Sequence, residues 1–250
     1  MKNFDQLLLD TIRTPELLAA PEIDEERKQF EADHPQAPAI RLLGPVTPIS
    51  DRAIQLIIAF EVTSEGVYER LYRRPTWPKG NSGVTIGIGY DLGYVKAPQV
   101  DRDWTPSLGA PAVDILSEQC GLTGEAAHQA LQRVTGIDVP FSAANTVFRQ
   151  TSAPRYTAET AGALPGAEAL SPDCLGALVS LVYNRGASFS ANGDRYAEMR
   201  AIKADVSQKH FADIPVQLRA MKRLWAGNPD MAGLVRRREL EALLFEQGLA

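Results

Sequence analysis

Residues Ile54–Tyr94 decide the fold and read IQLIIAFEVTSEGVYERLYRRPTWPKGNSGVTIGIGYDLGY. The first part is an apolar run with helical spacing, which follows the N-capping residues of 48–51 and ends in the carboxylate of Glu61. Residues 76–83 hold too many turn-forming residues for a helix or a strand. Residues 84–89 alternate β-branched residues with Thr and Gly, which is typical of a hairpin strand. This stretch therefore predicts a helix that ends in an acid and is followed by a β-hairpin.

From about residue 112 onward the chain is predicted to be helical. Ser171 and Pro172 form a strong helix start, because Ser caps the first turn and Pro fits its first position, and Gly186 marks the end. The predicted helices cover residues 112–120, 123–134, 141–151, 172–186, 195–206, 212–226 and 231–247. The fold class is therefore α+β and mostly α, with one small β-hairpin.

Residues 1–50 differ in character from the remainder. They begin with a short amphipathic helix within residues 1–20 and continue with an acidic and then proline-rich segment. We interpret 1–50 as an appendage and linker, and 51–250 as one main domain. No signal peptide or membrane-spanning run is recognisable, and the charge balance is too even to favour nucleic acid, so we expect neither membrane insertion nor nucleic-acid binding.

The cysteines and histidines give no sign of a metal site. Cys120 and Cys174 lack the C-x-x-C spacing of zinc sites and read as small core residues, although one disulfide between them stays open. His34, His128 and His210 share no motif and are each isolated in the sequence. We predict no metal and no cofactor.

Glu61 is the first candidate for catalysis. It follows an apolar helical run, and partial burial would raise the pKa of its carboxyl and keep it protonated, as a general acid requires. The structural alternative is a helix-end ion pair with Arg70 or Arg73.

Thr85 and Asp91 are the candidates for the second half of a catalytic site. They are six residues apart, so on a continuous strand both side chains would share one face, where the acid and the hydroxyl could hold a water. Alternatively, Asp91 caps a turn and Thr85 is only a good strand former. Glu65 and Glu69 are weaker candidates for the second acid, because exposed helical acids beside arginines usually form surface ion pairs.

Two further groups could contact a substrate. Asn184 and Arg185 stand where a helix ends and could bind sugar hydroxyls, or else they cap that end and pair locally. Trp77 stands in the loop before the hairpin and could stack on a sugar, although packing is its commoner role.

These pieces together resemble the phage-type (T4-like) lysozymes, a family of muramidases. Three stretches carry the resemblance, in the order that the family has them and over about 51–247: Phe60-Glu61 ahead of Val84–Tyr90, Leu181–Gly186, and Gly233-Leu234 followed by Arg237-Arg238 and Glu241. For the last stretch we expect a structural role, in which an arginine bridges Glu241 to neighbouring helices.

The resemblance implies a lysozyme-like fold with a β-hairpin lobe and a helical lobe, and it implies Glu61 as the general acid. The connection from Glu61 to Thr85 is longer than in the family, its usual midway Asp has no counterpart, and Tyr90 stands where His is usual. The active-site layout is closer to the muramidase domain of the bacteriocin pesticin, which places the catalytic Asp after the Thr, at Asp91 here. Tyr90 joins the expected substrate contacts.

The resemblance also implies a function: hydrolysis of the β-1,4 bond between N-acetylmuramic acid and N-acetylglucosamine, by a phage endolysin or a secreted antibacterial effector. The alternatives are a non-catalytic glycan-binding module with a lysozyme-like fold, and a glycosidase of the chitinase or chitosanase type. We expect a monomer that is made in the cytoplasm and acts on peptidoglycan in the periplasm or cell wall after holin-dependent or secretion-dependent export. An immunity or inhibitor protein, or export machinery, would be a further partner.

Overall fold

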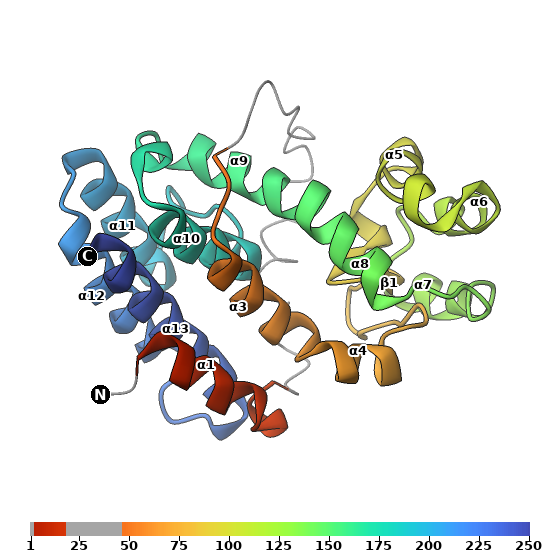
Figure 1. Ribbon diagram of the computed structural model, residues 1–250, viewed down its shortest axis with the longest axis horizontal. Helices are drawn as coiled ribbons and strands as arrows, with labels where there is room; N and C mark the ends of the chain where they lie inside the picture. Colours follow the sequence, from red (N-terminus) through yellow and green to blue (C-terminus); the bar gives the residue numbers. More distant parts are fainter. Residues whose placement is uncertain (1–2, 19–46) are drawn as a thin grey trace. The chain divides into compact units, whose positions relative to one another are not determined.

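The structure is a computed structural model that describes residues 3–18 and 47–250. The chain forms two compact units: unit 1 comprises Met1–Phe60 with Ala153–Ala250, and unit 2 comprises Glu61–Ser152. Both are helical except for one small antiparallel sheet in unit 2, which confirms the mostly α, α+β class (Figure 1). Most of the predicted linker, and His34 within it, lie outside the described residues. No helix in the described ranges is long and apolar enough to span a membrane.

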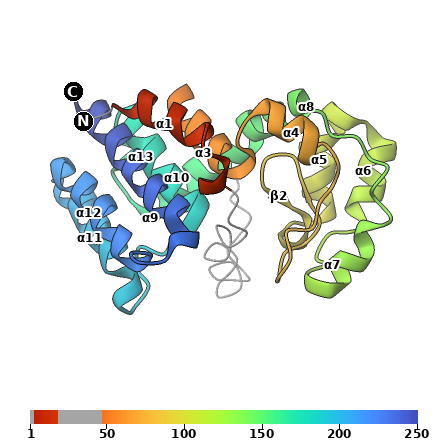
Figure 2. The ribbon, with the colours of Figure 1, turned by 90° about the horizontal axis from the view of Figure 1, so that it is seen from below.

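Unit 1 is built around α10 (Pro172–Arg185), whose side chains from Cys174 to Arg185 are all buried. Its α10 packs against α13 (Ala232–Leu249) and α9 (Ala153–Ala163), while α12 (Ile214–Ala220) packs against α13 and α11 (Ala197–Gln208). The first helix, α1 (Phe4–Ile12), lies alongside α13 (Figures 1 and 2), and α3 (Asp51–Val62) runs from unit 1 into unit 2.

Unit 2 surrounds a hairpin with short helices. Its strands are β1 (Thr85–Ile86) and β2 (Tyr90–Asp91). The helices are α4 (Glu65–Leu71), α5 (Ala97–Leu108), α6 (Ala110–Ser117), α7 (Gly124–Leu131) and α8 (Phe141–Val147), and a π-helical turn, Phe148–Ser152, follows α8.

The prediction of one strand over 84–89 is wrong, because the hairpin turn lies inside it. Gly87 and Gly89 have φ angles of +59° and +63°, a left-handed conformation that favours glycine and reverses the chain between Ile86 and Tyr90. A side chain at Gly87 would also place its Cβ 2.6 Å from Trp104. Two short paired strands therefore replace one longer strand.

The helix predictions succeed where capping residues stand at both ends. At α10 the Ser171 hydroxyl accepts a hydrogen bond from the Cys174 amide, and Gly186 ends the helix with φ +69°. The helix predicted over 212–226 is too long, because the α-helix ends at Ala220 and continues as a 3-10 turn, Met221–Leu224. The prediction missed α5 entirely: Pro98 lies in its first turn, where proline is tolerated, and Pro106 lies inside it.

A buried ionic cluster joins α13 to α10 and confirms the structural role expected of Arg237, Arg238 and Glu241. All three side chains are fully buried. One oxygen of Glu241 accepts hydrogen bonds from Arg238 (2.8 Å), Ser180 (2.7 Å) and, at 3.4 Å, Arg237. Burial lowers the pKa of Arg238 to about 9, and the Glu241 carboxylate counteracts that shift.

Removing the carboxylate of Glu241 should be strongly destabilising. The change Glu241→Ala leaves two buried guanidinium groups without their shared acceptor, so we expect a loss of about 3–5 kcal/mol in the free energy of unfolding. The matched control is Glu246→Ala, which removes an exposed partner of Arg219 and should cost at most about 1 kcal/mol. Urea denaturation of both variants measures the difference, and equal losses would contradict the central role of Glu241.

The close contact between α10 and α3 leaves no room for a methyl group at Gly176. A Cβ there would lie 2.2 Å from the Cβ of Ala53, so Gly176→Ala should destabilise by about 1–3 kcal/mol through overpacking. In α9, Gly162→Ala meets nothing within 4 Å and should stabilise by up to about 1 kcal/mol, because alanine favours helix. Thermal melts of the pair should shift in opposite directions, and a shift in the same direction would argue against the tight crossing.

Candidate active site

The hairpin brings Thr85 and Asp91 together. The strands pair in an antiparallel register that sets Thr85 directly opposite Asp91. Directly opposed residues of an antiparallel pair point to the same face of the sheet, so the expected common face is confirmed. Cross-strand pairing causes it, rather than alternation along a single strand.

Asp91 is buried, and its carboxylate binds backbone amides. The Gly83 N–H donates to both carboxylate oxygens, at 2.9 and 3.2 Å, and the Gly93 N–H donates at 2.8 Å. A Cβ on Gly83 would lie 2.2 Å from the Gly93 nitrogen, so only glycine allows this close approach. The capping role is therefore present, and Asp91 fixes the shape of the hairpin whatever else it does. The Thr85 hydroxyl donates a weak hydrogen bond to the Gly83 carbonyl (3.4 Å).

Glu61 lies in the last turn of α3, one residue before the helix ends at Val62. Its neighbours Phe60 and Val62 are buried, and Glu61 itself is half-buried. The next turn contains Thr63 at φ +66°, an unfavourable conformation for a β-branched residue, and Ser64 then caps α4. The carboxyl group of Glu61 thus belongs to a helix end held by a strained backbone.

The two competing acids occupy different surroundings. Glu69 accepts hydrogen bonds from the Phe141 amide (2.8 Å) and from Arg73 (2.7 Å), which fastens α4 to the start of α8. Arg73 also pairs with Asp138 at 2.6 Å. Glu65 is exposed in the first turn of α4. Glu69 therefore has a structural role, as Asp91 does, and the choice of Asp91 as the second acid stays a prediction.

The aromatic candidates of unit 2 differ in exposure. Trp77 is half-buried, stacks on His128 with ring centroids 4.4 Å apart, and donates from its indole N–H to the Ser82 carbonyl (3.0 Å). Tyr90 is buried and donates its hydroxyl to Asp103 at 2.8 Å. Of the two, Trp77 is the one with a partly exposed ring.

Asn184 and Arg185 belong to unit 1 and are buried at the end of α10. The Asn184 amide oxygen accepts from Arg238 (3.1 Å), and Arg185 donates to the Arg195 carbonyl (3.0 Å). The Arg185 guanidinium also lies over the Trp225 ring, and burial lowers its pKa to about 10. These contacts are within the protein, and a role in substrate binding stays a prediction.

The two cysteines are unpaired, and one histidine lies beside two acids. Cys120 and Cys174 are free thiols, and burial raises the pKa of both. The interpretation of His210 as isolated is wrong: it lies beside Asp205 and Asp213, close enough for all three to hold a metal ion. The D-x4-H-x2-D spacing was visible in the sequence, but it crosses a helix end and matches no familiar ligand motif.

Comparison with known proteins adds one partial match. A family model described as "Domain of unknown function (DUF8812)" matches residues 57–158. This range contains Glu61, Thr85 and Asp91, and it ends before Asn184 and Arg185. No curated protein matches the chain.

Proposed function

We propose that the protein is a muramidase with a lysozyme-like fold, which cleaves the β-1,4 bond between N-acetylmuramic acid and N-acetylglucosamine in peptidoglycan. Glu61 is the general acid of this proposal, and Asp91 and Thr85 position the attacking water. The observation that carries the proposal is the register of the hairpin, which sets Thr85 opposite Asp91 in the same unit as Glu61.

Backbone strain gives independent support. Residues in sparsely populated conformations concentrate at functional sites, where the surrounding structure holds them in place. Thr63, at φ +66°, stands two residues after Glu61. A strained bend at this position would fix the direction of the Glu61 carboxyl relative to the substrate bond.

The proposed reaction is a single displacement. Glu61 gives its proton to the glycosidic oxygen as the bond from that oxygen to the sugar C1 breaks. Asp91 takes a proton from a water, whose oxygen forms the new bond to C1, and the Thr85 hydroxyl orients that water. Carboxyl groups about 6.5–9.5 Å apart favour this inverting course, and about 5–5.5 Å favours retention. A carboxylate has about four acceptor positions, so capping a turn and orienting a water are compatible roles for Asp91.

A second candidate is a glycan-binding module that keeps the fold without the reaction. It is favoured by the backbone hydrogen bonds of Asp91, which explain this buried acid without catalysis. Such a module would bind peptidoglycan saturably and release no reducing ends. A chitinase or chitosanase would release products from chitin or chitosan instead.

Whether it is a phage endolysin or a secreted antibacterial effector, the protein has to reach the cell wall. We propose release through a phage holin or a secretion system, and a monomeric protein that acts on the periplasmic or cell-wall polymer. In the effector setting, the producing cell requires an immunity or inhibitor protein that blocks the enzyme.

Replacing the proposed acid should abolish hydrolysis. Glu61→Gln keeps the shape of the side chain but removes the proton donor, so we expect at least a ~10²-fold loss in the rate of reducing-end release from peptidoglycan. Glu65→Gln, an exposed acid four residues away, is the matched control and should retain wild-type activity. Mass spectrometry of the wild-type digest should find reducing N-acetylmuramic acid. Full activity of Glu61→Gln would refute this assignment, and binding by the wild type without products would favour the glycan-binding module.

Asp91→Asn separates the catalytic role of this residue from its structural one. The amide replaces one acceptor oxygen with an N–H donor that faces the amides of Gly83 and Gly93, so the melting temperature should fall. Activity should be measured well below that temperature, with circular dichroism to verify folding. We expect the rate of reducing-end release per folded molecule to fall at least ~10²-fold, beyond any loss caused by unfolding. A folded variant with wild-type activity would show that Asp91 only shapes the hairpin.

A further inference from the structure

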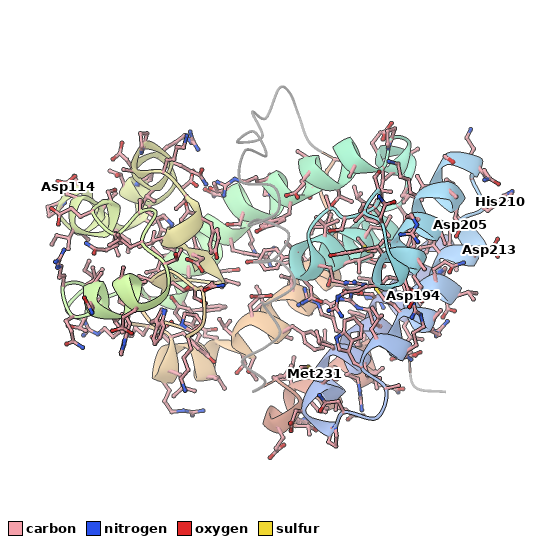
Figure 3. The ribbon with its side chains drawn as sticks, turned by 180° about the vertical axis from the view of Figure 1, so that it is seen from behind. Asp114, Asp194, Asp205, His210, Asp213 and Met231 are labelled. Atoms are coloured by element: carbon pink, nitrogen blue, oxygen red, sulfur yellow. The ribbon has the colours of Figure 1, made fainter. Side chains whose placement is uncertain are left out.

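We infer that Asp205, His210 and Asp213 form a binding site for a divalent transition-metal ion of the zinc class. The three side chains offer two carboxylates and one imidazole, a mixed oxygen and nitrogen set that suits Zn²⁺ and its neighbours. They lie beside one another where α11 gives way to α12 (Figure 3). The site lies wholly within unit 1, so it is independent of the proposed hydrolase site in unit 2.

The backbone brings the three residues together. Helix α11 ends at Gln208, and Lys209 adopts a left-handed conformation with φ +60°. This turn lets the His210 amide donate to the carbonyl of Asp205 (2.8 Å), and the Asp213 amide then donates to the carbonyl of His210 (3.0 Å). Each ligand residue is thus tied to the next through the main chain, so little order has to be gained when an ion binds.

The side-chain geometry fits one ion. The candidate ligand atoms of the three residues all lie within 4.8 Å of one another. A point equidistant from three atoms at that spacing is about 2.8 Å from each, against about 2.0–2.2 Å for ligands of bound zinc. Rotations that move each ligand atom by less than an ångström would close the site. Three protein ligands leave a fourth, tetrahedral position for water.

One oxygen of the site lacks a hydrogen-bond partner. Asp205 is half-buried, and His210 and Asp213 are exposed. The Oδ2 atom of Asp205 is itself buried, and no group in the described part of the chain bonds to it. A buried acceptor without a partner is costly, and a metal ion would satisfy it. A cation between Asp205 and Asp213 would also offset the repulsion between their two carboxylates.

The position of the site indicates what the ion does. Asp205 lies in the last turn of α11, where the helix dipole favours positive charge, and Asp213 immediately precedes α12. A bound ion would therefore link the end of α11 to the start of α12. An ion that binds the folded state and not the unfolded state stabilises the folded state, so bound metal should raise the melting temperature of the protein.

Titration of the untagged full-length chain, stripped with EDTA, tests the site. We expect Zn²⁺ to bind with one ion per chain in calorimetry and to raise the melting temperature by several degrees. Co²⁺ should give a visible spectrum without a thiolate charge-transfer band, which excludes ligation by Cys120 or Cys174. His210→Gln and Asp205→Asn should each weaken Zn²⁺ binding at least about tenfold and remove the thermal shift.

Two matched controls separate the site from chance surface binding. His128→Gln alters an exposed histidine near Glu125, and Asp114→Asn alters an exposed aspartate of α6, and both should bind Zn²⁺ like the wild type. The inference is overturned if the wild type binds no Zn²⁺, if His210→Gln and Asp205→Asn bind it as the wild type does, or if the controls weaken binding equally. Circular dichroism of the metal-free variants should match that of the wild type, so that lost binding reports lost ligands.

Discussion

A single buried carboxylate, that of Glu241, holds the helical core of unit 1 together. It lies between two fully buried guanidinium groups, and one of its oxygens accepts from Arg237, Arg238 and Ser180. Charges in such a setting are tolerated only where geometry and hydrogen bonding compensate for lost hydration. Through Ser180, which belongs to α10, the carboxylate connects α13 to α10.

In unit 2, the buried carboxylate of Asp91 plays a similar structural role, although it organises only the hairpin. A carboxylate that accepts from the amides of Gly83 and Gly93 sets the path of the chain on both sides of the hairpin. Under the proposed function, this one side chain would serve both the structure of the hairpin and the reaction. A hairpin with only two residues in each strand has little pairing energy of its own, so its rigidity depends on such side-chain bonds.

The sequence predicted what local chemistry determines and missed what distant packing determines. The ends of α10 follow from Ser171, Pro172 and Gly186, and the end of α3 near Glu61 follows from its apolar run. The hairpin turn was misplaced because Gly87 reads equally well as a strand residue until Trp104 packs against it. The burial of Asn184 depends on Arg238, a partner far along the chain that no local pattern contains. The meeting of His210 with Asp205 is local, but it depends on the left-handed turn at Lys209, a non-glycine residue that does not signal such a turn in the sequence.

Strained backbone conformations occur beside both candidate sites. Among the described residues, the non-glycine residues with positive φ are Thr63, Lys79 and Lys209. Thr63 follows Glu61, Lys79 stands in the loop before the hairpin, and Lys209 forms the turn between Asp205 and His210. Glycine would adopt each conformation at lower cost, but it would also leave the unfolded chain and the local backbone freer. Strain accepted at these three positions is therefore consistent with a need for rigid placement of the neighbouring side chains, which both an acid catalyst and a three-ligand metal site require.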